Sequence, residues 1–180
     1  MPSSFTSFDD MITKQTILAI DPGLRETGIA QFHGKELVDF GVKSLRRPGN
    51  AKSRTTFLCE IVARLLLERN PDVVAIEKNS FGHIPQNQPL MAAIERVKGL
   101  ISEAKIPIWE FAPNTIKKEV TSDGRATKRQ VANVLSAKFP ELKAYREADR
   151  KWRERYYQNM FDAVACGLTY LKLYDEDRLK

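Results

Sequence analysis

The order of the apolar segments is the feature that most limits how this chain can fold. Three short runs rich in β-branched residues come first. After them, apolar residues at helical spacing alternate with two further short runs. Three strands followed by helix, strand, helix, strand and more helices is the order of a mixed sheet covered on both faces. We therefore predict an α/β fold with a mixed five-stranded sheet and helices on both faces.

Turn signals rich in Gly, Pro and Asp separate the expected elements. The expected strands are Thr16–Ile20, Gly28–Phe32, Leu37–Val42, Val73–Ile76 and Ile106–Phe111. Helices are expected over the apolar face from Phe57 to Leu66, over Met91–Ile101, and from Pro113 onward with one interruption at Ser122–Gly124. Residues 1–15 are polar and are predicted to be a flexible lead-in without the features of a secretory signal. Residues 16–180 have the length of one domain.

The chain contains two cysteines, Cys59 and Cys166, and each lies within an apolar helical pattern. Such cysteines are usually small core residues of a protein in a reducing compartment. No apolar run is long enough to cross a membrane. We therefore expect a cytoplasmic protein that makes no contact with a membrane.

The positive charge is concentrated in one stretch. The formal net charge is +6, and residues 113–155 contain twelve Lys or Arg against six Asp or Glu, which accounts for the whole excess. A localised basic surface favours a polyanionic partner, usually a nucleic acid. A solvated surface that is rich in lysine explains the charge equally well.

Three acidic residues stand beside apolar segments. Asp21 directly follows the first strand, Glu77 directly follows the fourth, and Asp162 borders an apolar helical face. A carboxylate held among apolar residues is costly unless a partner satisfies it, and Mg²⁺ prefers oxygen ligands. Each acid alone is also explained as a turn residue, a strand end or a solvated helix border. Together they predict a metal site.

Two metal ions about 4 Å apart would support phosphoryl chemistry at such a site. We predict that Asp21 bridges both ions, that Glu77 holds one of them and that Asp162 holds the other. One ion would generate the attacking hydroxide, and the other would stabilise the leaving 3′ oxygen.

Five motifs, in order, resemble those of RuvC-type Holliday junction resolvases. They are Ile20-Asp21-Pro22-Gly23 with Thr27-Gly28, Ala75-Ile76-Glu77, Pro113-Asn114-Thr115-Ile116-Lys117, the basic element from Gly124 to Val131, and Asp162-Ala163. Their order and spacing cover about Ile17 to Tyr170. The resemblance implies a ribonuclease H-like fold and a homodimer that binds a four-way DNA junction. It also implies paired nicks made with Mg²⁺, or with Mn²⁺ in its place.

The chain departs from this family at one position. The family usually carries an Asp or His three residues before the last acid, and here that residue is Asn159. Residues at i and i+3 share a helix face, so the amide oxygen of Asn159 is a candidate fourth ligand without charge. Gln158 is a second neutral neighbour. Either the second metal is held more weakly, or the protein binds junctions better than it cuts them.

Thr127 and Gln130 form a capping-box pattern, which predicts a helix start there. Lys128 and Arg129 then lie in the first turn, where cations oppose the helix dipole unless an anion binds. Contact with DNA phosphate is one explanation, and two surface cations in salt are the other. The same choice applies to further basic residues of the two helical motifs, which we also predict to bind DNA: Lys117, Lys118 and Arg125.

The polar loop Asn79–Pro89 follows Glu77 and therefore borders the predicted site. Phe81 is an aromatic candidate for stacking on bases or wedging between them, or it folds back onto the domain. His83 could contact phosphate, although a lone loop histidine usually has no such role.

We predict a structure-selective DNA endonuclease that resolves four-way junctions. A junction-binding protein with weak or no cleavage and a nuclease for other branched nucleic acids are the alternatives. A sugar-kinase or actin-like nucleotide domain is disfavoured, because the chain lacks room for a second domain and a later glycine-rich loop. A dimer suits the two-fold symmetry of a junction. Its candidate interface, which could equally be core, is the stripe Met91, Ile94, Val97 and Leu100.

Overall fold

The structure, a computed structural model, describes residues 15–44, 50–78, 88–146 and 151–176, and the side chains of 151–155 and 175–176 are excluded. The predicted lead-in, apart from Gln15, lies outside these ranges. Phe81 and His83 lie outside them as well.

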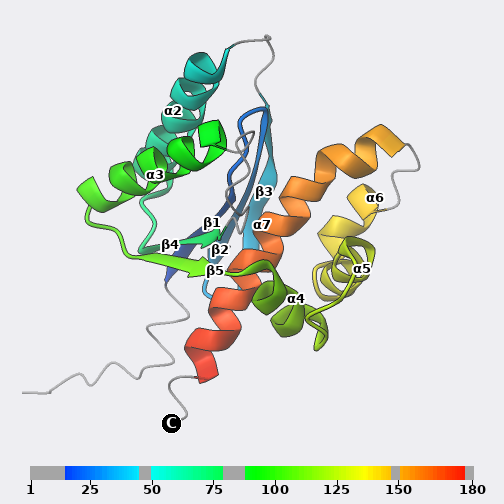
Figure 1. Ribbon diagram of the computed structural model, residues 1–180. Helices are drawn as coiled ribbons and strands as arrows, with labels where there is room; N and C mark the ends of the chain where they lie inside the picture. Colours follow the sequence, from blue (N-terminus) through cyan, green and yellow to red (C-terminus); the bar gives the residue numbers. More distant parts are fainter. Residues whose placement is uncertain (1–14, 45–49, 79–87, 147–150, 177–180) are drawn as a thin grey trace, which may run out of the picture.

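The predicted mixed five-stranded sheet is confirmed (Figure 1). Its strands stand in the order β3-β2-β1-β4-β5, with β1–β3 antiparallel and β4 and β5 parallel to β1. The bounds are β1 Thr16–Asp21, β2 Glu26–His33, β3 Glu36–Ser44, β4 Val73–Glu77 and β5 Ile108–Phe111. Each predicted strand is present. β1 and β4 extend one residue past the prediction and β2 and β3 three residues, because ladder hydrogen bonds continue past the apolar run, whereas β5 begins at Ile108 and not at Ile106 as predicted.

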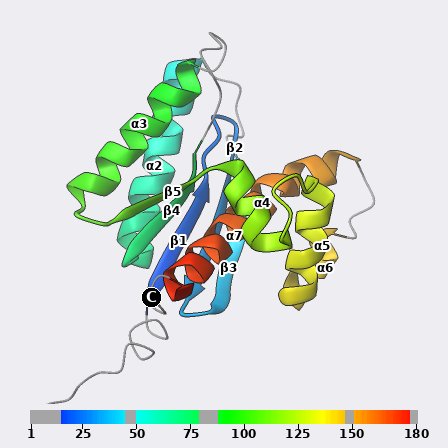
Figure 2. The ribbon, with the colours of Figure 1, turned by 60° about the horizontal axis from the view of Figure 1, so that its bottom comes forward.

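Helices cover both faces of the sheet, as predicted, but they divide unequally (Figures 1 and 2). One pair, α2 and α3, lies together on one face. The long helix α7 crosses the other face, with α4, α5 and α6 packed against it. The bounds are α2 Ala51–Arg69, α3 Gln88–Glu103, α4 Pro113–Thr121, α5 Lys128–Lys138, α6 Lys143–Arg146 and α7 Lys151–Glu176.

Alternation along the central strands divides the core into two clusters. Leu18 and Ile20 of β1 pack with α2 and α3, whereas Ile17 and Ala19 pack with α7. Successive side chains of a strand point to opposite faces, so this division continues to the strand end. Asp21, next in the alternation after Ala19, is therefore directed toward the α7 face.

The C-terminal helices contain an interruption that the sequence prediction missed. The predicted break between α4 and α5 is present, but a second follows at Phe139, where the backbone is extended before the 3₁₀ turn Pro140–Leu142. Proline disfavours helical backbone at the preceding residue, which ends α5. The predicted capping box is confirmed, with Thr127 accepting from the Gln130 backbone N–H and the Gln130 side chain accepting from Thr127 N–H.

Half of the candidate dimer stripe on α3 is core, and Leu100 is only partly buried. Ile94 and Val97 are buried, and Val97 belongs to the α2–α3 cluster, whereas Met91 is 43% exposed. Helical periodicity identifies an apolar face without saying which surface covers it. Cys166 is a buried core residue as predicted, but Cys59 is only partly buried. Within the described ranges, no helix is long and apolar enough to span a bilayer.

An aromatic group joins the edge strand β5 to the C-terminal half of α7. The Trp109 ring lies edge-on to Tyr170 with centroids 5.6 Å apart, and 6.5 Å from Tyr174. Its other neighbour is Phe111, at 6.3 Å. Aromatic contacts of this kind add packing energy beyond the area that they bury.

Candidate active site

Two of the predicted acids meet at one end of the sheet. Asp21 ends β1 and Glu77 ends β4. The strands are parallel with Ile20 opposite Ile76, so Asp21 and Glu77 are the next pair in register. Ala75, two residues before Glu77, packs in the α7 cluster. Side chains two apart share a face, and both carboxylates are therefore directed toward α7.

Helix α7 supplies the third predicted acid. The Asp162 side chain is 15% exposed, and both of its oxygens accept hydrogen bonds. Lys128 Nζ donates to Oδ2 at 2.7 Å, and Gln158 Nε2, one turn earlier on α7, donates to Oδ1 at 2.8 Å. The orientation of this carboxylate is thus fixed from two sides.

The three carboxylates share one electrostatic environment. Burial raises the pKa of Asp21 well above its usual value, and the charges of Asp162 and Glu77 raise it further. Burial and the charge of Asp162 raise the pKa of Glu77 to about 7, while Lys128 and Lys117 act in the opposite direction. Mutual repulsion between carboxylates shows that the fold brings these acids together despite its cost.

Glycines allow α7 to approach the sheet closely enough for this meeting. Gly28 pairs with Asp21 across β1 and β2, and a Cβ on Gly28 would lie 1.8 Å from the Asn159 carbonyl oxygen. Farther along α7, a Cβ on Gly167 would lie 2.3 Å from the Phe32 ring. Any larger residue would force the helix away from the strand end.

Asn159 binds backbone at this close approach. Its Nδ2 donates to the Glu26 carbonyl oxygen at 3.1 Å, which fastens α7 to the start of β2. The buried Thr27 hydroxyl donates to the Gly23 carbonyl at 3.0 Å and closes the turn between β1 and β2. The motif that begins at Asp21 therefore has a structural part, which positions the strand end and α7.

The predicted DNA-binding residues lie on α4, α5 and the turn between them. Lys117 and Lys118 belong to α4, and Arg125 lies in the turn, where its N–H donates to Asp123 Oδ1 at 2.8 Å. Lys128, the first residue of α5, reaches into the carboxylate group instead of pointing to solvent alone. A pairing between residues 34 apart in sequence has no local signal, so sequence analysis missed it.

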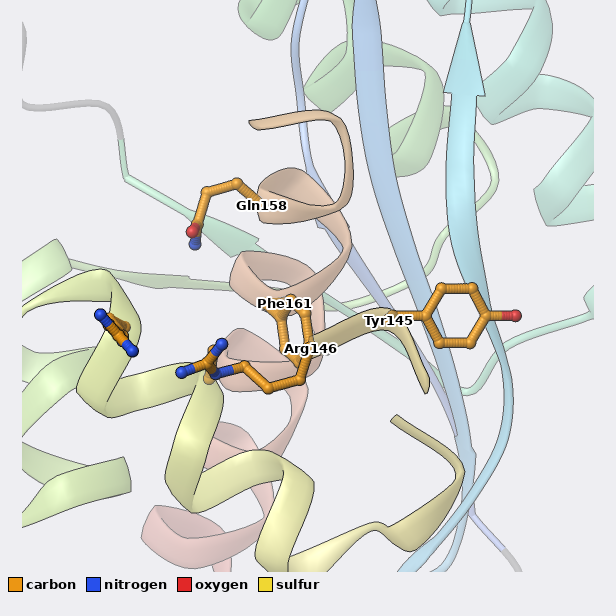
Figure 3. A pocket seen from close by; sticks show the side chains of 6 residues that line it. Tyr145, Arg146, Gln158 and Phe161 are labelled. Carbon is orange, nitrogen blue, oxygen red and sulfur yellow. The ribbon is translucent and has the colours of Figure 1, made fainter. Parts of the chain in front are cut away.

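Arg129 lines a hollow between α5, α6 and α7 together with Arg146, Tyr145, Gln158, Phe161 and Ala132. Figure 3 shows the Arg146 side chain in front of α7, near Phe161, with Gln158 one turn away. Arg146 Nε also donates to Asn133 Oδ1 at 2.7 Å. Sequence analysis did not select Arg146, although the basic stretch that contains it was a usable signal. Arg129 and Arg146 thus line the same hollow as Gln158, which donates a hydrogen bond to Asp162.

The donor set fits a hard divalent cation, since three carboxylates from rigid elements are directed to one place. Among the described residues, no three acidic, histidine or cysteine side chains stand close enough, as they are, to hold an ion. Both oxygens of Asp162 accept hydrogen bonds, one from Lys128 and one from Gln158. Metal binding would require these carboxylates to close around the ion.

Comparison with known sequences gives a consistent result. The sequence model of a family described as "Crossover junction endodeoxyribonuclease RuvC" matches residues 17–149, a range that ends before α7. A protein of that name from Akkermansia muciniphila is 31% identical over 169 residues, covering 91% of this chain and 93% of the relative. Another, from Cytophaga hutchinsonii, is 34% identical over 128 residues, covering 67% of this chain and 62% of the relative.

Solved structures show the same fold. RuvC from Thermus thermophilus in complex with a Holliday junction substrate aligns with a TM-score of 0.72 at 22% identity, covering 91% of this chain and 96% of that chain. The yeast mitochondrial Holliday junction resolvase Ydc2 aligns with a TM-score of 0.68 at 14% identity, covering 92% and 81%. The predicted ribonuclease H-like fold class is thereby confirmed.

Proposed function

Since this chain belongs to the RuvC family of crossover junction endodeoxyribonucleases, we propose that it resolves four-way DNA junctions by paired, metal-dependent phosphodiester hydrolysis. The observation that carries the proposal is the meeting of Asp21, Glu77 and Asp162 at one sheet end, beside the basic helices α4 and α5. Acids supply metal ligands, and the basic residues supply contacts for a phosphate backbone.

Asp21, Glu77 and Asp162 would hold the metal, with Mg²⁺ as the proposed ion, two ions per site and Mn²⁺ as a substitute. The chemistry that such ions supply is activation of water and stabilisation of the leaving oxygen of the phosphodiester. The raised pKa values of Asp21 and Glu77 support this assignment, because crowded acids with such values gain most from a nearby cation.

Neighbouring residues would orient these ligands. Gln158 holds one oxygen of Asp162, and Asn159 fastens α7 to β2 through its amide nitrogen. The amide oxygen of Asn159 is the atom that would serve as a neutral fourth ligand. Groups that orient a metal ligand commonly change metal affinity or activity about 10- to 100-fold when they are removed.

Lys117, Lys118, Arg125, Lys128 and Arg129 are the proposed phosphate contacts. They lie on consecutive elements around the acids, so one strand of a junction could contact several of them. Lys and Arg contacts to phosphate raise affinity without reading sequence. Phe81, outside the described residues, is proposed to stack on bases near the crossover, as an aromatic that follows Glu77 in sequence.

A homodimer would place two such sites on the two symmetric strands of a junction. The α3 stripe is a weak candidate for its interface, since Ile94 and Val97 are already buried within the chain. Light scattering at micromolar concentration measures the assembly, and an exclusively monomeric protein would contradict paired cutting.

Cleavage of a synthetic four-way junction in Mg²⁺ tests the proposed function. Asp21→Asn, Glu77→Gln and Asp162→Asn should each abolish cleavage while retaining junction binding, because they remove a ligand charge but leave the basic surface. Glu110→Gln is the matched control, since Glu110 lies on β5 in an ion pair with Lys98. Its cleavage should match wild type.

The same assay separates the alternatives. Binding without cleavage by the wild-type protein would identify a junction-binding protein. Faster cutting of three-way, flap or RNA-containing substrates would identify a different branched nucleic acid as the substrate. Near wild-type cutting by an Asp21, Glu77 or Asp162 variant would show that the residue is not a ligand.

A further inference from the structure

A lysine contacts the proposed metal-binding acids directly. Lys128 Nζ donates to Asp162 Oδ2 at 2.7 Å. Burial acts to lower the pKa of Lys128, but Asp162, Asp21 and Glu77 outweigh burial and raise it. The ammonium group therefore interacts with all three acids, although it forms an ion pair with one.

The local structure places this cation where a helix alone would disfavour it. Lys128 is the first residue of α5, and the capping box between Thr127 and Gln130 fixes the start of that helix. A positive charge opposes the helix dipole at this end. The acids of the site offset this unfavourable placement and draw the side chain toward Asp162.

The two partners of the ion pair differ in their freedom. The Asp162 side chain is 15% exposed and is also held by Gln158, whereas the Lys128 side chain is 61% exposed. A long, exposed lysine can leave through solvent without moving the backbone. The acid is the fixed partner, and the cation is the removable one.

Lys128 and a divalent ion would compete for the same carboxylate. The ammonium charge lowers the affinity of Asp162 for an ion, because Lys128 and a divalent cation bound at Asp162 repel each other. The acids as they stand are not gathered closely enough for an ion, among the described residues. Displacement of Lys128 would release Asp162 for closure around the metal.

We infer that Lys128 is an internal counter-cation that occupies Asp162 in the metal-free protein and is displaced by the divalent ion, which frees it to bind a DNA phosphate. This inference rests on the proposed function. Lys128 is thus a positioning residue: it holds the acids together before metal binds and makes metal binding weaker than the acids alone would allow. The Lys128 side chain thereby couples metal binding to the binding of a DNA phosphate.

Calorimetric titration of the full chain with Mg²⁺, without DNA, tests the inference. Lys128→Gln should tighten Mg²⁺ binding by about tenfold, the low end of what an opposite charge this close does to a carboxylate. Lys128→Arg should remain close to wild type, because it keeps the cation. Lys138→Gln is the matched control: it removes a lysine charge from the last turn of the same helix, and its Mg²⁺ affinity should change by less than about twofold.

The melting temperature of the metal-free protein provides an independent readout. Lys128→Gln and the length-matched Lys128→Met should both melt cooperatively and at a lower temperature than wild type, since three carboxylates then face one another without the cation. Mg²⁺ should raise the melting temperature of these variants more than that of wild type. A merely structural lysine would lower the melting temperature without improving metal affinity.

Side-chain NMR of ¹⁵N-labelled lysine observes the displacement itself. The Lys128 ammonium signal should be that of an ion-paired group without metal, and it should change in step with Mg²⁺ saturation. Equal or weaker Mg²⁺ binding by Lys128→Gln, or a Lys128 signal unaffected by Mg²⁺, would overturn the inference. An absence of saturable Mg²⁺ binding in every variant would instead overturn the proposed metal site, while junction binding would remain to be scored separately.

Discussion

The two faces of the sheet are built from different side chains. On the α2–α3 face the central strands present large aliphatic residues, including Leu18, Ile20 and Ile29. On the α7 face the positions nearest the acids are small, Ala19, Ala30 and Ala75, whereas Ile17, Phe32 and Val73 of the same strands lie farther from the acids. All of these residues are buried, so the difference is one of size and not of exposure.

This difference separates stability from chemistry. Large aliphatic side chains keep α2 and α3 at an ordinary packing distance and bury much apolar surface. Alanines and glycines let α7 approach until its backbone touches Gly28. Only the close helix can bring Asp162 to acids at the strand ends. Beside the acids, the α7 face therefore has small side chains that allow the helix to approach, whereas the opposite face has large aliphatic side chains there.

The largest difference between the two faces should come from replacing one glycine on each face by alanine. Gly28→Ala places a Cβ against the Asn159 carbonyl and should cost about 3 kcal/mol, as severe overpacking does. It should also lower junction cleavage by about 100-fold, since displacements near 1 Å have that effect on catalysis. Chemical denaturation and single-turnover cleavage measure the two effects.

Gly99→Ala on α3 is the matched change on the other side. Nothing lies within 4 Å of the added methyl group, so the variant should gain about 1 kcal/mol from helix propensity and cut normally. Equal behaviour of the two alanine variants would show that α7 is not held at a close approach.

A cavity in the α2–α3 face should affect stability alone. Leu58 is fully buried in the cluster on that face, and Leu58→Ala should cost about 3 kcal/mol of unfolding free energy. Cleavage and Mg²⁺ response per folded molecule should remain those of wild type, measured well below the melting temperature. A large loss of metal response would mean that the two faces are more tightly coupled than their packing indicates.

The pH dependence of stability should arise from the α7 face. The folded state raises the Glu77 pKa to about 7 through burial and Asp162, so folded protein binds this proton more tightly than unfolded protein does. Without metal, this group therefore lowers stability as pH rises from 4.5 to 7. Glu77→Gln should raise the melting temperature at pH 8 by about 3 °C, roughly what 1 kcal/mol does at this chain length, and have little effect at pH 4.5.

The pKa of Asp21 is raised as well. The stability of Glu77→Gln should therefore still fall as pH rises, but less steeply than that of wild type. Mg²⁺ should reduce the difference in melting temperature between wild type and Glu77→Gln at pH 8, because it neutralises the acids in wild type. Glu110→Gln, on β5, serves as the control and should leave the pH profile unchanged. A steeper profile in Glu77→Gln would contradict the assigned direction of the pKa shift.

The smallest effect is expected at Asn159, where the α7 face departs from its family. Asn159→Asp adds a charge on the helical face of Asp162 and should lower the Mg²⁺ concentration for half-maximal cleavage severalfold. It should also lower the metal-free melting temperature slightly, because a carboxylate cannot donate to the Glu26 carbonyl as Nδ2 does. Asn159→His should have part of the effect on metal. If wild type and both variants cleave with the same Mg²⁺ dependence, Asn159 is not a metal ligand and serves only its hydrogen bond to the Glu26 carbonyl.

Local patterns predicted the fold well. Alternating and helical periodicities located the five strands, and side-chain chemistry located the Thr127 capping box. The break at Phe139 was also readable, because Pro140 follows it, but helical composition on both sides concealed it. The α3 stripe was ambiguous in principle, since an apolar face packs equally well against its own domain or another chain.

The acids of the proposed site were selected from the sequence, but their contacts were not. Asp21 and Glu77 end apolar strands, and that signal is local. Lys128 meets Asp162 only after α5 and α7 pack together, and Asn159 meets Glu26 across 133 residues. Partners of this kind depend on tertiary geometry. From the sequence, the basic helix start suggested phosphate for Lys128, and the ligand position of the family suggested metal for Asn159.

The aromatic group at β5 gives the molecule an optical reporter. Trp109 is one of two tryptophans in the chain, and its ring contacts Tyr170, two helical turns beyond Asp162 on α7. Fluorescence from this partly exposed indole depends on the position of α7 against the sheet. With Trp152 replaced by phenylalanine, the emission of Trp109 would report movements of α7 relative to the sheet in real time, without an attached dye.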